Sequence, residues 1–272
     1  MAYLRYEYKS MALSRGVTLD IFLPTEVYNS VEPPYKTLYF LPGYSVSSNE
    51  IITWLRIRRQ AELKGIAIVI PNGDNAFYVD HPERGTNYST FVGKEIVEET
   101  RKILPLSRKR EDTFIGGISM GGGGSITNGV RFKDTFGKIA ALSPTLDFYS
   151  AVHEAPGAGF NQEMIDNIFG SEEEFMHSDY NVNHLYFDKK EEVAEYPELF
   201  LACGRGDRLV YKKAKQFVDD LKKAQIPVTY REDEGDHELD FWEKMLDPMF
   251  SFLKGIPEGT LNEIKIPYGD ED

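Results

Sequence analysis

The sequence predicts an α/β protein with a mostly parallel central sheet, an antiparallel N-terminal edge and helices on both faces. Two observations lead to this fold class. Compact apolar runs without alternation recur along the 272 residues, as in parallel strands that helices cover on both sides. Segments in which apolar residues recur at helical spacing lie between several of these runs, and such an order predicts right-handed crossovers between parallel strands.

The strand candidates differ in their pattern. From Val17 to Leu23 apolar and polar residues alternate, which is typical of a half-buried strand. The two candidate strands nearest the N-terminus leave no room for a crossover helix between them, so they are expected to form an antiparallel hairpin at the sheet edge. The continuous apolar runs are 37–41, 66–70, 114–118 and 199–203, with weaker candidates at 139–142 and 228–230.

Three amphipathic stripes predict helices over 96–104, 211–221 and 239–253. Residues 147–196 lack a clear core strand, and a segment of that length is often a lid or a pocket wall. We therefore expect one domain over residues 1–254, interrupted by this insertion at about 147–196. Residues 255–272 are expected to form an acidic C-terminal tail.

The composition of the chain argues against several classes of partner and of binding site. The chain has 44 acidic and 31 basic residues, a formal net charge of −13, which makes nucleic acid an unfavourable partner. The single cysteine, Cys203, excludes an intramolecular disulfide and a multi-cysteine metal site. The N-terminus lacks the apolar core of a signal peptide, and no apolar run is long enough to span a bilayer. A soluble, cytoplasmic protein without a metal site is expected.

The segment Gly117-Ile118-Ser119-Met120-Gly121 matches the pattern G-x-S-x-G, in which a nucleophilic serine stands on a sharp turn between a strand and a helix. The apolar run before it and the glycine-rich helix start after it supply that context. A plain glycine-rich turn is the alternative. A phosphate-binding loop is disfavoured, because the Lys-Ser/Thr pair of P-loops is missing.

A serine nucleophile needs a histidine base and a carboxylate that orients the base. His237 follows the last strand candidate, and Asp207 follows the 199–203 run, which gives the chain order Ser, Asp, His of α/β-hydrolases. Asp236, Asp233 and Asp240 are weaker candidates for the carboxylate. The other histidines are more typical of loop positions, with a place in the pocket wall as the alternative; they are His81, His153, His177 and His184.

An oxyanion hole requires two aligned N–H donors. The backbone N–H of Met120 is the first candidate, and that of Tyr44, in the turn that Gly43 permits after the 37–41 strand, is the second. An ordinary Pro-Gly turn is the alternative for this second segment. The residues expected to bind substrate are Gly43, Asn75, Phe77, Tyr78 and Phe148, with Tyr149 and Phe160 as further aromatic candidates.

Five segments of the chain carry a similarity to a known family, namely 41–44, 71–75, 109–122, 203–207 and 235–242. They resemble the esterase D-like branch of the α/β-hydrolases, in particular bacterial tributyrin esterases and feruloyl esterases. The similarity implies the α/β-hydrolase fold, cofactor-free ester hydrolysis and catalytic roles for Ser119, Asp207 and His237. Pro42 and Leu239 stand where the family often has His and Trp, and the insertion has no clear match.

The sequence thus predicts a serine carboxylesterase that forms an acyl-enzyme with short-chain acyl or hydroxycinnamoyl (feruloyl-type) esters. An acyltransferase with the same triad and a non-catalytic ligand-binding protein of this fold are the alternatives. A serine peptidase is less favoured, because a chain this short shows no gating domain. The expected partner is a small-molecule or oligosaccharide ester, without nucleic acid or membrane, and self-association into a homo-oligomer is left open.

Overall fold

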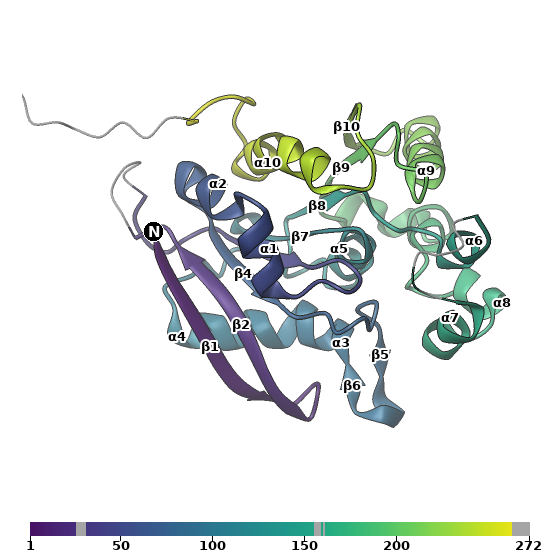
Figure 1. Cartoon of the computed structure of the whole chain (residues 1–272), viewed down its shortest axis with the longest axis horizontal. Coiled ribbons are helices and arrows are strands. Elements are labelled where there is room, and N and C mark those ends of the chain that lie inside the picture. The colour runs from purple at the N-terminus through teal and green to yellow at the C-terminus, as the bar shows by residue number, and fades with distance from the viewer. Residues whose placement is uncertain (26–30, 155–158, 160, 263–272) are drawn as a thin grey trace, which may run out of the picture.

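The structure, a computed structural model, describes residues 1–25, 31–154, 159 and 161–262. Among these residues lies an eight-stranded sheet with the order β1-β2-β4-β3-β7-β8-β9-β10 (Figure 1). The six strands from β4 to β10 run parallel, and β2 pairs antiparallel with both β1 and β4. The strands are β1 (Ala2–Ser10), β2 (Arg15–Leu23), β3 (Thr37–Leu41), β4 (Ala67–Pro71), β7 (Thr113–Ile118), β8 (Lys138–Leu142), β9 (Glu198–Gly204) and β10 (Thr229–Asp233).

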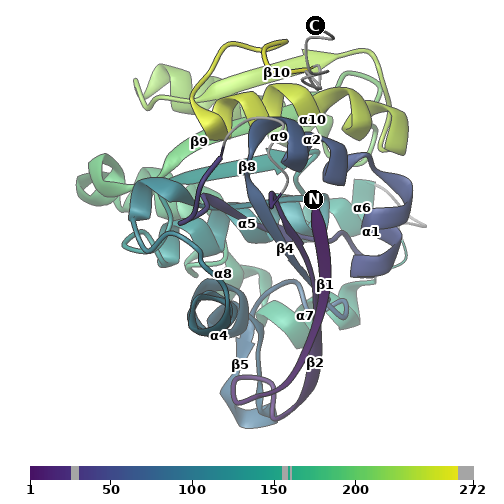
Figure 2. The same cartoon turned by 90° about the vertical axis from the view of Figure 1, so that its left-hand side faces the viewer.

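Helices cover both faces of the sheet, which explains why the central strands show no alternation. On β3, Leu38 and Phe40 belong to one apolar core and Tyr39 and Leu41 to the other, and all four are fully buried. α1 (Ser48–Trp54), α2 (Ile57–Lys64) and α10 (Leu239–Lys254) cover the first face, where α10 lies against α2 (Figure 2). The other face is covered by α4 (Ile96–Ile103), α5 (Met120–Arg131) and α9 (Tyr211–Lys223).

The predicted fold class is confirmed, with one correction at the edge. The hairpin partner of β2 is β1, whereas β3 lies between β4 and β7 in the interior of the sheet. Strand β1 was missed because its outward side chains are exposed and its inward ones only half-buried, so it lacks an apolar run. A pattern of tyrosines and charged residues is typical of an edge strand with one solvated face.

The segment between β8 and β9 contains helices and turns in its described part. Its elements are α6 (Phe148–Glu154), α7 (Gln162–Phe169), α8 (Glu172–Met176), the π-helix η5 (His184–Asp188) and the 3₁₀ helix η6 (Lys190–Glu195). α6, α7 and α8 gather at one side of the molecule, away from the β1 edge (Figure 1). Before β7 the chain adds β5 (Asp80–His81), η2 (Pro82–Arg84), β6 (Thr86–Asn87), α3 (Tyr88–Thr90), the π-helix η3 (Phe91–Glu95) and η4 (Arg110–Asp112).

None of the described helices is both long and apolar enough to cross a membrane.

A buried lysine ties the end of α2 to α10 and to the C-terminal segment. Lys64 is fully buried, and its ammonium lies 2.8 Å from an oxygen of Asp247 on α10 and donates to Asn262 Oδ1 at 2.8 Å and to the Thr260 carbonyl. Burial acts to raise the pKa of Asp247, but hydrogen bonds from Lys64 and the Gly259 amide outweigh it and hold that pKa below its usual value.

We expect Lys64→Met to lower the free energy of unfolding by roughly 1–3 kcal/mol, because the half-buried Asp247 carboxylate loses its cation. Lys223→Met is the matched control, since it removes an exposed ion pair with Asp220 that water screens, and its effect on the free energy of unfolding should be clearly smaller. Urea unfolding at neutral pH measures both effects, and equal losses would contradict the role of Lys64.

The same variant has a predictable pH dependence. The pKa of Asp247 is lower in the folded protein than in the unfolded chain, so its stabilisation is complete above the unfolded value of about 3.9. It is lost as the pH falls through the folded pKa. The difference between the native protein and Lys64→Met should therefore shrink below about pH 4.

Candidate active site

Ser119 lies on the turn between β7 and α5, in a backbone conformation that residues other than glycine rarely adopt. Its φ is 54° and its ψ −118°, and such strain persists only where the surroundings enforce it. The Ser119 N–H donates to the carbonyl of Leu142 at the end of β8 (2.9 Å), and the Ser119 carbonyl accepts from Gly123 and Thr145. The turn is thus fixed by both the neighbouring strand and the following helix.

The glycines of this motif allow the loop after β3 to approach Ser119. A Cβ on Gly121 would lie 2.0 Å from the Leu41 carbonyl oxygen, and one on Gly117 would lie 2.4 Å from the same atom. Any side chain at either position would push the two strand ends apart. On the approaching loop, a Cβ on Gly43 would lie 3.4 Å from Ser119 Cβ, so this loop passes directly beside the serine.

Two further loops bring His237 and Asp207 to Ser119. Asp207 follows β9 and His237 follows β10, and the carboxyl ends of parallel strands lie at the same edge of a sheet. His237 Nε2 lies 2.9 Å from Ser119 Oγ, and His237 Nδ1 lies 2.7 Å from Asp207 Oδ2. The structure therefore brings together the three residues that the sequence selects.

The surroundings favour one tautomer of His237. The Asp207 side chain is fully buried, and its other oxygen accepts the backbone N–H groups of Leu209 and Val210, each at 3.1 Å. An ionised carboxylate can accept but not donate a hydrogen bond, so it accepts Nδ1–H of the neutral imidazole. Nε2 is then left with its lone pair toward the Ser119 hydroxyl, which is the arrangement required of a general base.

The competing residues make other contacts. The Asp236 carboxylate accepts the backbone N–H of its neighbour His237 (2.8 Å), and Asp233 forms an ion pair with Lys244 (2.6 Å). Cys203 is fully buried, and burial raises the pKa of its thiol, which disfavours the nucleophilic thiolate. Of the remaining histidines, His81 contacts Glu83 beside β5, and the others lie in the insertion.

Trp242 supports His237 and was missed as a site residue. Its ring meets the imidazole edge to face, with 5.2 Å between the centroids, and its indole N–H donates to Ser143 Oγ at 3.1 Å. The sequence assigned Trp242 to the buried stripe of α10. Its place in the first turn of that helix, shortly after His237, was a signal that could have indicated this contact.

The loop after β3 is held by residues of the 72–78 segment. The Tyr78 hydroxyl donates to the Pro42 carbonyl (2.8 Å), and Asn75 Oδ1 accepts the Ser45 N–H (2.6 Å). Asn72 Oδ1 accepts the Ser48 N–H (2.8 Å). The sequence analysis expected Tyr78 to bind substrate. In the structure this side chain is fully buried, and it supports the loop instead of lining an open substrate pocket.

An aromatic cluster lies next to the first turns of α5. The Phe77 ring meets that of Phe148 edge to face at 4.8 Å between centroids, and Phe148 stacks on Phe169 of α7 at the same distance. The cavity that these three side chains and Gly123 line has a volume of about 10 Å³, which is barely room for one water molecule. Tyr149 is buried and donates to the Gly170 carbonyl, and Phe160 lies outside the described residues.

The insertion also reaches the loop after β3. The Tyr44 hydroxyl donates to the Gly159 carbonyl at 3.0 Å and lies 3.6 Å from Met164 Sδ on α7. The Tyr44 ring also packs against Phe77, with 5.7 Å between the centroids. Tyr44 therefore connects the segment that carries the second candidate oxyanion donor to the insertion.

Proteins of known activity are similar to this chain in sequence and in structure. An acetyl esterase of Caldicellulosiruptor saccharolyticus is 33% identical over 271 residues, which cover 95% of this chain and all of that protein. The structure of an S-formylglutathione hydrolase of Staphylococcus aureus is similar with a TM-score of 0.82 and 26% identity, over 93% of this chain and 98% of that one.

A ferulic acid esterase structure has a TM-score of 0.72 over 94% of this chain and 99% of its own, and at 22% identity it supports the fold alone. The fold is that of the α/β-hydrolases, as the sequence predicts. The family described as "Putative esterase" matches residues 10–253. The chain therefore belongs to this esterase family and is a carboxylic ester hydrolase.

Proposed function

We propose that the chain is a serine esterase that hydrolyses short-chain acyl esters, acetyl esters in particular, through an acyl-enzyme on Ser119. The observation that carries this proposal is the hydrogen-bonded chain from Ser119 through His237 to Asp207. The strained turn supports it further, because it holds the serine at the end of β7 beside the first turn of α5.

The proposed mechanism has two halves. Ser119 Oγ attacks the ester carbonyl while His237 Nε2 takes the hydroxyl proton, and the buried Asp207 carboxylate stabilises the imidazolium. The backbone N–H groups of Met120 and Tyr44 donate to the developing oxyanion. The carbonyl re-forms, the C–O bond to the alcohol breaks, and His237 protonates that alcohol. Water, deprotonated by His237, then attacks the acyl-enzyme, and Ser119 leaves with the proton.

The small acyl group is supported by two observations. As part of this proposal, the acyl group lies beside the aromatic cluster, because Gly123 and Thr145, whose N–H groups donate to the Ser119 carbonyl, also line the cavity there. That cavity is too small for a hydroxycinnamoyl ring, since Phe77, Phe148 and Phe169 fill the space. The acetyl esterase that is 33% identical spans nearly the whole chain. The feruloyl-type ester of the sequence analysis requires these aromatic side chains to move apart.

A formyl thioester is the second candidate substrate. The similarity to an S-formylglutathione hydrolase structure favours it, and a formyl group is smaller than an acetyl group. The same serine chemistry serves a thioester, because the thiolate leaves more readily than an alkoxide. A substrate panel therefore includes this compound.

Ser119→Ala should lower kcat toward p-nitrophenyl acetate by at least about 10⁴-fold, because no hydroxyl remains to form the acyl-enzyme. Steady-state hydrolysis with the native protein alongside measures the loss. A fluorophosphonate should label a single peptide in the native protein, the one that contains Ser119. Label on any other serine, or retained turnover in the variant, would refute the proposal.

Asp207→Asn should lower kcat by roughly 10³–10⁴-fold with little change in unfolding temperature, because the amide can donate to Nδ1 and place the proton on Nε2. Asp236→Asn is the matched control, since this carboxylate lies next to His237 in the chain and contacts its backbone N–H rather than its ring. Similar losses in both variants would contradict the assignment of Asp207.

Acyl preference is tested with p-nitrophenyl acetate, butyrate and octanoate, methyl ferulate, an acetylated xylo-oligosaccharide and S-formylglutathione, with Ser119→Ala as the blank. We expect kcat/KM to fall with acyl length, and Phe148→Ala to raise the octanoate-to-acetate ratio about 10-fold or more by opening the cavity.

Phe175→Ala controls for loss of packing, because Phe175 belongs to the same aromatic cluster without lining that cavity. A native preference for methyl ferulate or octanoate would overturn the short-acyl proposal while leaving the serine esterase intact. Transfer of the acetyl group to an added alcohol in preference to water would instead favour the acyltransferase.

A further inference from the structure

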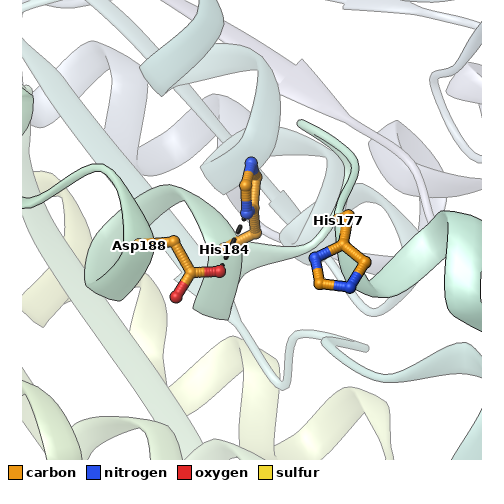
Figure 3. Close-up of side chains that lie close together, drawn as sticks. All are labelled: His177, His184 and Asp188. Carbon is orange, nitrogen blue, oxygen red and sulfur yellow. Dashed lines mark hydrogen bonds and ion pairs between the residues drawn. The ribbon is translucent and has the colours of Figure 1, made fainter.

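A cluster of two histidines and an aspartate lies on the insertion, and the reaction at Ser119 does not use it. One ligand atom from each of His177, His184 and Asp188 lies within 4.8 Å of the others (Figure 3). We propose that these three side chains bind a divalent transition-metal ion of the zinc class. The sequence analysis expected no metal site, because it treated these histidines as separate loop residues.

The geometry is near that of a tetrahedral site. Bonds of about 2.0–2.1 Å place two ligand atoms of a tetrahedral zinc ion roughly 3.3 Å apart. His184 Nδ1 and Asp188 Oδ2 are 2.9 Å apart, so this pair needs to open by about half an ångström. The His177 ring lies at 88° to that of His184, with 6.4 Å between the centroids, and has one nitrogen on the side of the pair (Figure 3). Because the three ligand atoms lie within 4.8 Å of one another, this ring has to approach by at most about 1.5 Å.

The backbone that carries the ligands is anchored beneath the surface. His184 and Asp188 begin and end the π-helix η5, and His177 follows α8 directly. π-Helical turns place residues four apart on nearly one face and occur frequently at functional sites. Both elements are anchored by fully buried side chains, namely Phe175 on α8 and Leu185 and Tyr186 on η5.

The loop between the ligands is also fixed. Asn181 is 2% exposed, its amide group donates to the Met176 carbonyl (2.9 Å), and its carbonyl oxygen accepts the Asn183 N–H (3.0 Å). These bonds hold the end of α8 and the start of η5 at a set separation. Ion binding therefore calls mainly for rotation of side chains, and the exposure of His177 and Asp188 leaves room for it.

The donor set selects the class of ion. Two imidazoles and one carboxylate suit zinc and its neighbours among the transition metals, whereas calcium and magnesium prefer sets of oxygen atoms. Lys189 follows Asp188 in sequence, but its ammonium pairs with Asp179, which offsets its charge. Three protein ligands leave a fourth position to water, and the exposure of the cluster gives the ion access.

The expected consequence is structural. A bound ion would link the end of α8 to η5 within the insertion, which also carries Phe169 and the Met164 contact with Tyr44. None of the three proposed ligands belongs to the group Ser119, His237 and Asp207. Ion binding should therefore stabilise the fold by linkage without changing turnover of a small ester.

The test uses the untagged full chain, treated with EDTA and titrated with ZnCl₂ against a chromophoric zinc chelator. We expect one ion per chain and a higher unfolding temperature with zinc. His177→Gln, His184→Gln and Asp188→Asn should each weaken binding by at least about 10-fold and remove the thermal shift. Co²⁺ in place of zinc should give the visible absorption of a tetrahedral site with nitrogen ligands.

His153→Gln is the matched control, an exposed histidine on α6 of the same insertion that should bind zinc as the native chain does. Absence of stoichiometric binding, or equal binding by all four variants, would overturn the proposal. Binding that survives in the three ligand variants but is lost in His237→Ala would place the ion at the catalytic histidine and overturn it as well. Ester hydrolysis by the zinc-free protein tests the proposed function separately.

Discussion

The close contact of three backbone segments at Ser119 is the constraint on which the rest of the site depends. The serine follows the central strand β7, its N–H is bonded to the end of β8, and the loop after β3 lies against its Cβ. Such contact requires glycine on both sides of the serine and a positive φ at the serine itself. Once Ser119 is fixed there, β9 and β10 can supply Asp207 and His237 from the same edge of the sheet.

Much of this arrangement could be predicted from the sequence, because it follows the chain order and the strand ends. The run before Ser119, the run before Asp207 and the last strand candidate before His237 each end at the active edge of the sheet. Contacts between distant side chains carry no periodicity and were missed. The Tyr78 hydrogen bond to Pro42 and the convergence of His177 with η5 depend on tertiary packing. The Trp242 contact with His237 is local, and the position of Trp242 in the first turn of α10 was a signal that the sequence analysis did not use.

The insertion supplies contacts to the site that the local sequence pattern of residues 147–196 could not indicate. Its inner side supplies Phe148 and Phe169 to the aromatic cluster next to α5, and its Gly159 carbonyl accepts a hydrogen bond from Tyr44. The loop after β3 is therefore held from two directions, by Tyr78 and Asn75 on one side and by the insertion on the other. Changes of sequence in the insertion can alter the geometry around the serine without replacing any residue of the triad.

The burial of Cys203 has a practical consequence for work with this enzyme. The thiol is the single one in the chain, it lies in the last core strand before Asp207, and its raised pKa leaves little thiolate in the folded state. Alkylating reagents and mild oxidants reach such a sulfur when the sheet opens, and far more slowly while it stays closed. The rate of thiol modification therefore measures how often the core opens. This measurement needs no added label and leaves Ser119 unmodified.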